Sequence, residues 1–370
     1  MIMAGAPPLP VTVIIPAYNR ADTVARAVAS ALAQRPAPPA EVLVVDDGSG
    51  DDTTEVAERA GARVVRHAAN RRLGAARNTG LAHATQPWIA LLDSDDEWLP
   101  HHLASLWPHR TGHVLMAGSA LRCTPDGGQR HVGPPEPGGR VLRSPADVAV
   151  TSIVAASAVL ARRDVVDAAG AFTEFDGAMH GVEDVDLWLR LLEHGTGYVS
   201  GRVSVLYHEH GGQMSAAGNG LQLARRAVLE SYAGRSWFRP QLLDAWDGVV
   251  GWDAARSAQR AGEGRLALAH LAGVARNPHG ARALLRELRV RHAGRRRSSQ
   301  VTRSGARTLA VVDPPTAPAE PPPGFALMVP PGRTKLARYL ALARRPASAV
   351  LVDGRPERLL ARALGMRPVG

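Results

Sequence analysis

The sequence has little of several residue types, and each shortage excludes something. Its 370 residues include one cysteine, Cys123, so no internal disulfide forms, which fits a reducing compartment. No apolar run reaches the roughly 18 residues of a membrane-spanning helix, and the start MIMAGAPPLP lacks the basic and long apolar regions of a signal peptide. We therefore expect a soluble, cytoplasmic protein. Because 45% of the residues are hydrophobic, the chain can still bury a sizeable core.

Lysine is nearly absent, since only Lys335 among the 44 basic residues is not arginine. The formal net charge of +10 is uneven: residues 1–235 hold 21 basic and 25 acidic residues, residues 236–300 hold 12 and 5, and residues 301–370 hold 11 and 4. The excess of basic residues therefore belongs to the C-terminal third. Such a region is either solvated surface or a contact for an anionic partner. Its few aromatic side chains argue against nucleic acid, which needs stacking platforms.

The first hundred residues alternate between strand and helix patterns. Apolar or β-branched runs such as VTVIIPAYN, EVLVVDD, ARVVRHA and PWIALLD are separated by segments with apolar residues at helical spacing. This alternation predicts an α/β fold with a mixed, mainly parallel sheet and helices on both faces. Ligands of such sheets bind beyond the carboxyl ends of the strands, where Asp46, Asp47 and Asp93 fall.

The run WIALL leads into four acids, Asp93, Asp95, Asp96 and Glu97. Two interpretations are open. Acids at a helix N-terminus cap free amides and favour the helix dipole. Alternatively, closely spaced carboxylates form a metal or phosphate site. We expect Glu97 to begin the next helix, so that each interpretation applies to different residues.

Five motifs occur in order along the chain: VIIPAYNR, VLVVDDGSGDDT, GAARNTGL, LLDSDDEW and GVEDVDLWLRLLEHG. Each is weak alone, but in this order and spacing residues 10–215 resemble the family 2 glycosyltransferases, which have a Rossmann-like GT-A fold. The resemblance implies an inverting enzyme that moves a sugar from a nucleotide-diphosphate donor, with a UDP-sugar favoured, to a hydroxyl of a glycan, glycolipid or polysaccharide precursor. The QxxRW motif of processive synthases is missing, which predicts the addition of single sugars.

The resemblance implies a divalent metal, Mg²⁺ or Mn²⁺, that compensates the charge of the diphosphate. In the segment Asp93-Ser94-Asp95, Asp95 matches the metal ligand, and Asp93 matches a contact to the ribose or the metal shell. His210 in YHEHGGQMS sits at the family's histidine, which contacts metal or diphosphate, whereas His208 replaces the usual arginine. Without ligand, we expect Asp93 and Asp95 to be solvated; pairing with arginine would weaken the metal interpretation.

The same resemblance implies the nucleotide site. Its members would hold the base, the ribose and the diphosphate: Pro16, Ala17, Tyr18, Asp46, Asp47, Arg77, Asn78, Asp93 and Ser94. The alternatives are an Asx-turn for the paired aspartates and an ordinary helix surface for Arg77 and Asn78.

Inverting transfer needs a base that takes the proton of the acceptor hydroxyl. Glu183 and Asp184 match the family's ED motif, in which the aspartate is that base, and Glu183 would orient the acceptor. The alternative is that both acids merely favour the N-terminal dipole of a helix that ends at Gly195. Asp186, further along this helix, is expected to be structural.

Two other functions remain as alternatives: a catalytically inactive nucleotide-sugar-binding or scaffold protein of the same fold, and a sugar nucleotidyltransferase. The latter normally has a Gly-rich, Lys-bearing loop where this chain has PAYNRADT. A dinucleotide oxidoreductase would need G-x-G-x-x-G after the first strand, which is missing.

We expect four regions: a catalytic domain over residues 10–235, a basic helical extension over 236–300, a Pro-rich linker over 301–324 and a small α/β segment over 325–370. Residues 281–297 place apolar side chains at helical spacing against seven arginines. This stretch either contacts an anionic membrane surface peripherally, near a lipid-linked acceptor, or packs on the catalytic domain. The donor sugar, the acceptor and the oligomeric state stay open.

Overall fold

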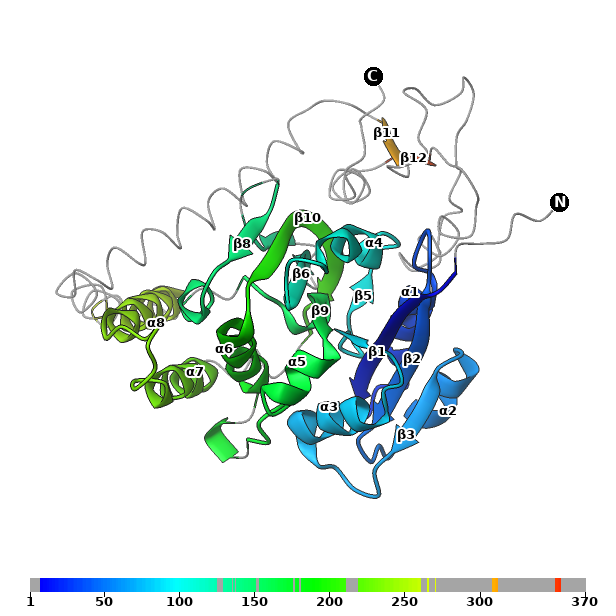
Figure 1. Ribbon diagram of the computed structural model, residues 1–370, viewed down its shortest axis with the longest axis horizontal. Helices are drawn as coiled ribbons and strands as arrows, with labels where there is room; N and C mark the ends of the chain where they lie inside the picture. The colour runs from blue at the N-terminus through cyan, green and yellow to red at the C-terminus, as the bar shows by residue number, and fades with distance from the viewer. Residues whose placement is uncertain are drawn as a thin grey trace.

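The computed structural model describes residues 7–124, 129–134, 136, 138–150, 153–175, 177–179, 181–210, 219–260, 265, 270, 308–311 and 350–353. Within this part a central sheet lies between two layers of helices (Figure 1). The strands of the structure are β1 Leu9–Ala17, β2 Pro39–Asp46, β3 Arg63–Arg66, β4 Trp88–Leu91, β5 Glu97–Trp98, β6 Leu115–Cys123, β7 Gln129–Val132, β8 Arg140–Leu142, β9 Val159–Arg162, β10 Gly197–His208, β11 Thr308–Val311 and β12 Val350–Asp353. The α-helices are α1 Val24–Leu32, α2 Thr53–Arg59, α3 Arg72–His83, α4 His102–Leu106, α5 Arg163–Ala168, α6 Glu183–His194, α7 Asn219–Ser231 and α8 Gln241–Arg260, with short 3₁₀ turns η1 Trp107–His109, η2 Pro145–Asp147, η3 Ala156–Ala158 and η4 Gly177–Met179.

The large sheet has the strand order β3-β2-β1-β4-β9-β6-β10-β5, with β7 paired to β6 and β8 to β10. The pairs β3–β2, β2–β1, β1–β4 and β6–β10 are parallel, whereas β9 runs antiparallel between β4 and β6. This mixed, mainly parallel sheet confirms the predicted fold class. The carboxyl ends of β1, β2 and β4 open at one edge, as a parallel arrangement requires.

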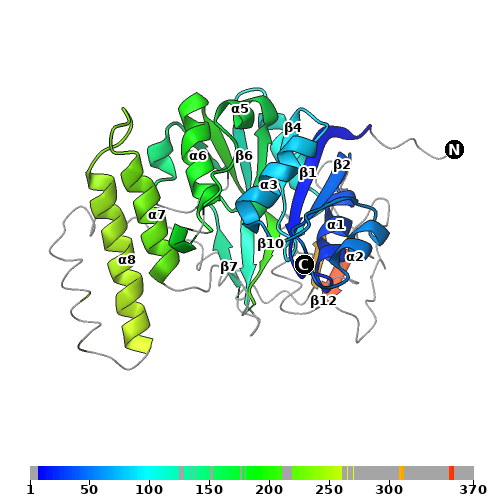
Figure 2. The same ribbon diagram turned by 90° about the horizontal axis from the view of Figure 1, so that it is seen from below.

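The alternation of side chains along β1 explains the two helical layers. Val13 and Ile15 belong to the core formed with α1, α2 and α4, whereas Ile14 belongs to the core formed with α3, α5 and α6. Successive side chains of a strand point to opposite faces, so an all-apolar strand needs helices on both sides. Figure 2 shows α3, α5 and α6 together in front of the sheet.

Helix α3 lies unusually close to β1 at Gly80. An added Cβ at this position would lie 2.4 Å from Cγ2 of Ile14. Glycine therefore lets the helix pack directly on the strand. Since Arg77 lies three residues before Gly80 on α3, this close packing also sets how deep Arg77 sits beneath the end of the sheet.

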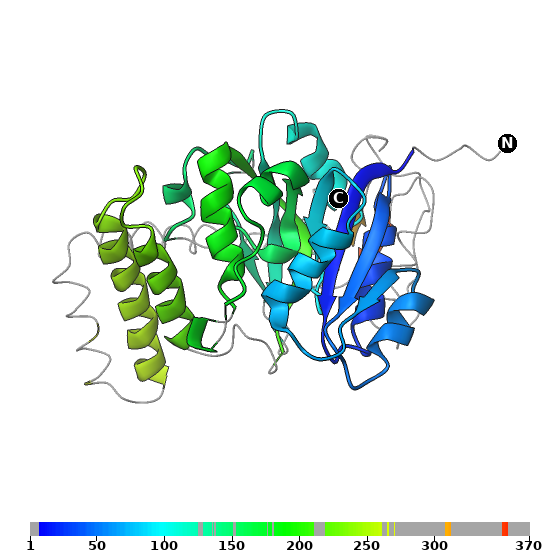
Figure 3. The same cartoon turned by 60° about the horizontal axis from the view of Figure 1, so that its bottom comes forward.

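The helices after the sheet extend the helical layer beside α6, and α7 shares its hydrophobic core. α7 and α8 lie side by side next to α6, as Figures 1 and 3 show. They confirm the helices predicted from residue 221 to 233 and from 241 onward, up to Arg260. The arginine-rich stretch 281–297 lies outside the described residues, and so does most of the tail. Strand β11 lies within the predicted linker, and it pairs antiparallel with β12, which lies in the predicted C-terminal segment.

Most predicted elements of the first 200 residues are confirmed, including the end of α6 at Gly195. The prediction for Glu97 is wrong. It lies in β5, which pairs with β10, and is 3% exposed. The apolar run before the acids and Trp98 after them bury the segment, so β pairing replaces the expected helix start. Among the described residues, no helix is both long and apolar enough to cross a membrane.

Candidate active site

Three strand ends and one helix start meet at the carboxyl edge of the sheet. Asp46 ends β2 and pairs in register with Ala17, the last residue of β1. The chain leaves β4 at Leu91, opposite Ile14 of β1, and reaches Asp93 two residues later. The first turn of α6 contributes Glu183 and Asp184. The fold thus brings the predicted acids, which are far apart in sequence, to one edge.

Arg77 joins the two acidic motifs. It is 1% exposed, and its terminal nitrogens donate to Oδ1 of Asp93 at 2.9 Å and to Oε1 of Glu183 at 2.8 Å. Its guanidinium also lies 5.4 Å from the ring centre of Phe172. Burial lowers the pKa of Arg77, but Asp93, Glu183 and Asp184 together raise it, so the guanidinium stays charged. The alternative of an ordinary helix surface is therefore wrong for Arg77.

Glu183 is 2% exposed, and burial raises its pKa, while Arg77 lowers it and Asp184 raises it again. Asp184 differs from its neighbour. It is only partly buried, its Oδ1 accepts the backbone N–H of Val185 at 2.7 Å, and among the described residues it has no ion-pair partner. Arg77 thus pairs with two of the three carboxyl groups, Asp93 and Glu183, and among the described residues Asp184 has no cation of its own. Asp186 accepts from Thr173 and Tyr232, in agreement with a structural role.

The acids after β4 form a turn in which the N–H of Asp96 donates to the carbonyl of Asp93 at 3.1 Å. Asp96 is fully buried and accepts from the Ser157 hydroxyl at 2.5 Å and from the His208 N–H at 3.1 Å. Burial, Asp95 and Asp93 raise its pKa well above the ordinary range. Asp96 therefore holds the turn through its buried hydrogen bonds to Ser157 and His208. Ser94 in the same turn is also buried, at 5% exposed.

The expectation that Asp93 and Asp95 are both solvated and free of arginine is wrong for Asp93, because Arg77 pairs with it. The physical reason is that Arg77 is buried and needs acidic partners. By the criterion stated above, this weakens the assignment of Asp93 to the metal. Asp95 instead meets His210, whose Nε2 lies 2.8 Å from Oδ2.

Asp95 offers a carboxylate, which Mg²⁺ or Mn²⁺ accepts when substrate phosphates complete the coordination, and the imidazole of His210 lies beside it. In the part of the chain that the structure describes, no group of three or more His, Cys, Asp and Glu residues is gathered as a metal site. Two protein ligands plus a diphosphate is thus the arrangement that these residues fit.

The paired aspartates at the end of β2 are buried. Asp46 is 0% exposed and accepts from the Ser49 N–H at 2.8 Å and from the Thr54 hydroxyl, which is the Asx-turn alternative. Asp47 is 3% exposed and accepts from Nδ1 of His67 at 2.6 Å and from the Arg71 N–H at 2.8 Å. Only one oxygen of Asp47 is engaged in these contacts. Asp46 is therefore occupied within the protein, whereas no contact from the described residues engages the second oxygen of Asp47.

Among the other residues predicted for the nucleotide site, some side chains are buried or used within the protein, and one is exposed. Pro16 and Ala17 are buried, whereas Tyr18 is 45% exposed at the end of β1 and is free to contact a ligand. Asn78 uses its whole side chain on Phe172 and Glu174: its Nδ2 donates to the carbonyl of Phe172 and to Oε1 of Glu174, and its Oδ1 accepts the Phe172 N–H, all at 2.9 Å. Asn78 anchors the segment after α5 rather than reaching the strand ends, so neither N–H of its amide is left to donate to a diphosphate.

Sequence reasoning missed Arg26, Ser157 and His67. Arg26 of α1 donates to the carbonyl of Asp95 at 2.5 Å. Ser157 accepts the Asp93 N–H at 3.2 Å while it donates to Asp96. No local pattern marks these two positions. His67 was accessible to reasoning, because it follows β3 just as Asp47 follows β2, and parallel neighbours place such residues together.

Comparison with known proteins fits this geometry. The family model for Glycosyl transferase family 2 matches residues 12–169. The putative glycosyltransferase EpsE of Bacillus subtilis is 30% identical over 200 residues, which cover 50% of this chain and 67% of that protein. The class is thus a glycosyltransferase fold of the GT-A type. The chain belongs to glycosyl transferase family 2.

Two further similarities define how far the likeness reaches. The succinoglycan biosynthesis protein ExoU of Rhizobium meliloti is 42% identical over 135 residues, or 34% of this chain and 39% of that protein. The chain therefore matches less than half the length of this relative. The mannosyltransferase PcManGT of Pyrobaculum calidifontis, solved with GDP-Man and Mn²⁺, is 18% identical with a TM-score of 0.50 over 75% of this chain and 86% of that one. At this identity the likeness concerns the fold.

Proposed function

We propose that the protein is a non-processive, inverting glycosyltransferase that moves one sugar from a nucleotide-diphosphate donor to an acceptor hydroxyl. The observation that carries the proposal is the cluster at the sheet edge, where buried Arg77 links Asp93 after β4 to Glu183 beside Asp184. Family membership supports the reaction class, and the succinoglycan relative supports a glycan or polysaccharide precursor as acceptor. A UDP-sugar remains the favoured donor.

Asp184 is the proposed base. Its carboxylate lies in the first turn of α6, partly exposed and without an ion pair among the described residues, so it can accept the proton of an approaching hydroxyl. Glu183 is held by Arg77 and fixes the start of α6, which orients Asp184. As the acceptor oxygen attacks the anomeric carbon, the proton passes to Asp184, and the bond to the diphosphate breaks on the opposite face.

The donor would lie along the strand ends. The second oxygen of Asp47 and the exposed ring of Tyr18 are suited to a nucleoside, which has N–H groups and a flat face. Asp95 and His210 would hold Mg²⁺ or Mn²⁺. When bound, the cation would compensate the charge that develops on the leaving diphosphate. Arg26 keeps the carbonyl of Asp95 in place.

The test begins with donors. UDP-, GDP- and dTDP-sugars with Mn²⁺ are screened by thermal shift, since a ligand that binds the native state raises the melting temperature. Donor hydrolysis or transfer is then compared in the wild type, in Asp184→Asn and in Asp167→Asn, an exposed acid on α5 that pairs with Arg163. We expect Asp184→Asn to lower the turnover by about 10²-fold or more and Asp167→Asn to leave it unchanged.

Proton NMR of the product then reads the anomeric configuration, which should be opposite to that of the donor. Unchanged turnover in Asp184→Asn would overturn the assignment of the base. Binding of donors without any turnover in the wild type would instead favour the inactive, nucleotide-sugar-binding alternative.

A further inference from the structure

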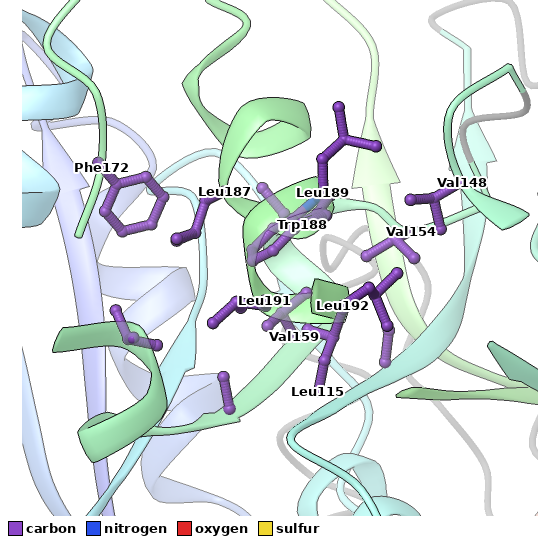
Figure 4. Packing of buried hydrophobic residues seen from close by; sticks show 14 of the residues in the cluster. Leu115, Val148, Val154, Val159, Phe172, Leu187, Trp188, Leu189, Leu191 and Leu192 are labelled. Carbon is purple, nitrogen blue, oxygen red and sulfur yellow. The ribbon is translucent and has the colours of Figure 1, made fainter. Parts of the chain in front are cut away.

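Helix α1 carries a row of polar side chains beside its apolar face: Arg26, Ser30 and, just past the end of the helix, Gln34. Residues four apart lie on one side of a helix, so the three side chains are neighbours. Ser30 is 1% exposed and Gln34 is 0% exposed. In comparison, α6 packs on the other face of the sheet with apolar side chains such as Leu191, which lies near Val159 of β9 (Figure 4). Buried polar side chains need hydrogen-bond partners, so the row on α1 must bind a specific segment.

That segment is residues 95–103, which follow the turn with the acids. All three side chains bind its main chain, through four hydrogen bonds: from Nη2 of Arg26 to the carbonyl of Asp95 at 2.5 Å, from the N–H of Trp98 to Oγ of Ser30 at 3.1 Å, from Nε2 of Gln34 to the carbonyl of Leu99 at 2.9 Å, and from the N–H of Leu103 to Oε1 of Gln34 at 3.0 Å. Strand pairing holds the segment only over the two residues of β5. The path of the chain from the acidic turn onward therefore depends on α1.

Arg26 is the charged member of the row, and it lies next to the proposed cation site. Besides the carbonyl of Asp95, it faces Glu97, whose side chain is 4% exposed and whose Oε2 lies 4.0 Å from Nε of Arg26. The imidazole of His208 lies 3.5 Å from the same oxygen. A buried carboxylate needs a counter-charge, and Arg26 is the only arginine paired with Glu97 among the described residues. Arg26 thus holds both neighbours of Asp96 in the turn.

The cation site offers few protein ligands, so the position of the Asp95 carboxylate matters. Groups that hold a metal ligand from behind typically change the metal affinity 10–100-fold when they are removed. We propose that Arg26 is a positioning residue: it holds Asp95, and with it the carboxylate that would bind a divalent cation together with the diphosphate of the donor. The inference rests on the proposed function, from which the cation and the diphosphate are taken. Arg26 acts through Asp95 and not on the substrate.

The test uses the full chain with Arg26→Met, Arg26→Lys and the double variant Arg26→Met/Glu97→Gln. Arg163→Met is the matched control. Arg163 also donates to a carbonyl, that of Ala84, and its Nε lies 3.7 Å from Asp167, but it lies beside the start of β4, at the opposite edge of the sheet. Calorimetry measures the affinity for UDP, or for whichever of GDP and dTDP the thermal-shift screen selects, with Mn²⁺ and with EDTA. The ratio of the two affinities is the metal-dependent gain.

We expect Arg26→Met to lower the metal-dependent gain by about tenfold or more and to leave the affinity in EDTA unchanged, because Asp47 and Tyr18 are untouched. Arg26→Lys should keep part of the gain, since an ammonium group reaches one of the two partners but lacks the fork of the guanidinium. Arg163→Met should behave like the wild type.

The double variant separates positioning from stability. Removing the charge of Glu97 should restore the stability lost in Arg26→Met, as measured by urea unfolding, because no buried carboxylate is left without a cation. The metal-dependent gain should stay low, because nothing holds the carbonyl of Asp95. Amide hydrogen exchange in a peptide over residues 93–98 should likewise be faster than in the wild type in both variants. If Arg26→Met alone does not fold, the double variant supplies the same comparison.

Four results would overturn the positioning role: no metal-dependent gain in the wild type, an unchanged gain in Arg26→Met, equal losses with Mn²⁺ and with EDTA, or recovery of the gain in the double variant. Absence of donor turnover in the wild type is a failure of the proposed function alone. The binding measurements still decide on Arg26 in that case, because they need no transfer.

Discussion

Replacing Arg77 by methionine tests the central link of the site, because it removes the cation while keeping most of the side-chain volume. Glu183 then stays buried with no positive partner, at 3% side-chain exposure. Breaking a buried ion pair in this way is strongly destabilising, since one charge is left uncompensated. The partly exposed Asp93, at 28%, adds little because water reaches it.

The size of the effect is limited by protonation of Glu183. The ordinary pKa of this group is 4.5, so forcing it to be neutral at pH 7 costs about 3 kcal/mol, at about 1.4 kcal/mol per pH unit. At pH 5 the same step costs less than about 1 kcal/mol. A folded-state pKa raised above the unfolded value gives stability that is lost as pH rises. Arg77→Met should therefore be destabilised by about 3 kcal/mol at pH 7 and much less at pH 5, each relative to the wild type.

Urea unfolding at the two pH values measures this difference. Arg162→Met is the control, because its pair with Asp164 is exposed on both sides and should contribute no more than about 1 kcal/mol. Adding Glu183→Gln to Arg77→Met should recover much of the lost stability. A loss below about 1 kcal/mol at pH 7, or a loss that does not shrink at pH 5, would show that Arg77 does not neutralise Glu183.

Two further predictions concern the fold. Gly80→Ala should destabilise the protein by about 1–3 kcal/mol, because the new Cβ would meet β1 at 2.4 Å. Gly220→Ala in α7 is the control: the added Cβ would have nothing within 4 Å, so the change should be neutral or stabilise the protein by up to about 1 kcal/mol. If urea unfolding gave equal effects for the two variants, the close packing of α3 on β1 would be contradicted. Burial lowers the pKa of His101 and of His102 to about 3, the nearby Arg202 adding to the effect at His101. Since the unfolded chain takes up these protons near pH 6.5, stability should fall by about 1 kcal/mol per histidine between pH 6.5 and 5.5. His102→Gln should remove about 1 kcal/mol of this loss between pH 6.5 and 5.5 in denaturation curves, and an unchanged pH dependence would show that His102 is not held neutral.

The site was predictable from sequence at the level of motifs. The alternation of strands and helices placed Asp46, Asp47 and Asp93 at the carboxyl edge of the sheet, because parallel strands end together, whereas Glu183 and Asp184 were assigned from the family resemblance alone. What each acid does was not predictable. Asn78 and Asp46 match the nucleotide-binding motifs, yet the fold uses them for internal hydrogen bonds. A motif specifies only residue types. The hydrogen-bond partners that surround each of these side chains come from segments that are distant in the sequence.

The sequence by itself determined the α/β class, the alternation of the first seven elements and the end of α6, because periodicity, glycine and apolar runs act over a few residues. Only the tertiary structure decided the pairings. Arg77 meets Glu183 across 106 positions of the chain, and Glu97 became a strand because β10 lies beside it. A buried charge needs a counter-charge, and the edge of a strand needs hydrogen-bond partners. In both cases the partner is far away in the sequence and comes close only when the layers pack, so local sequence cannot identify it.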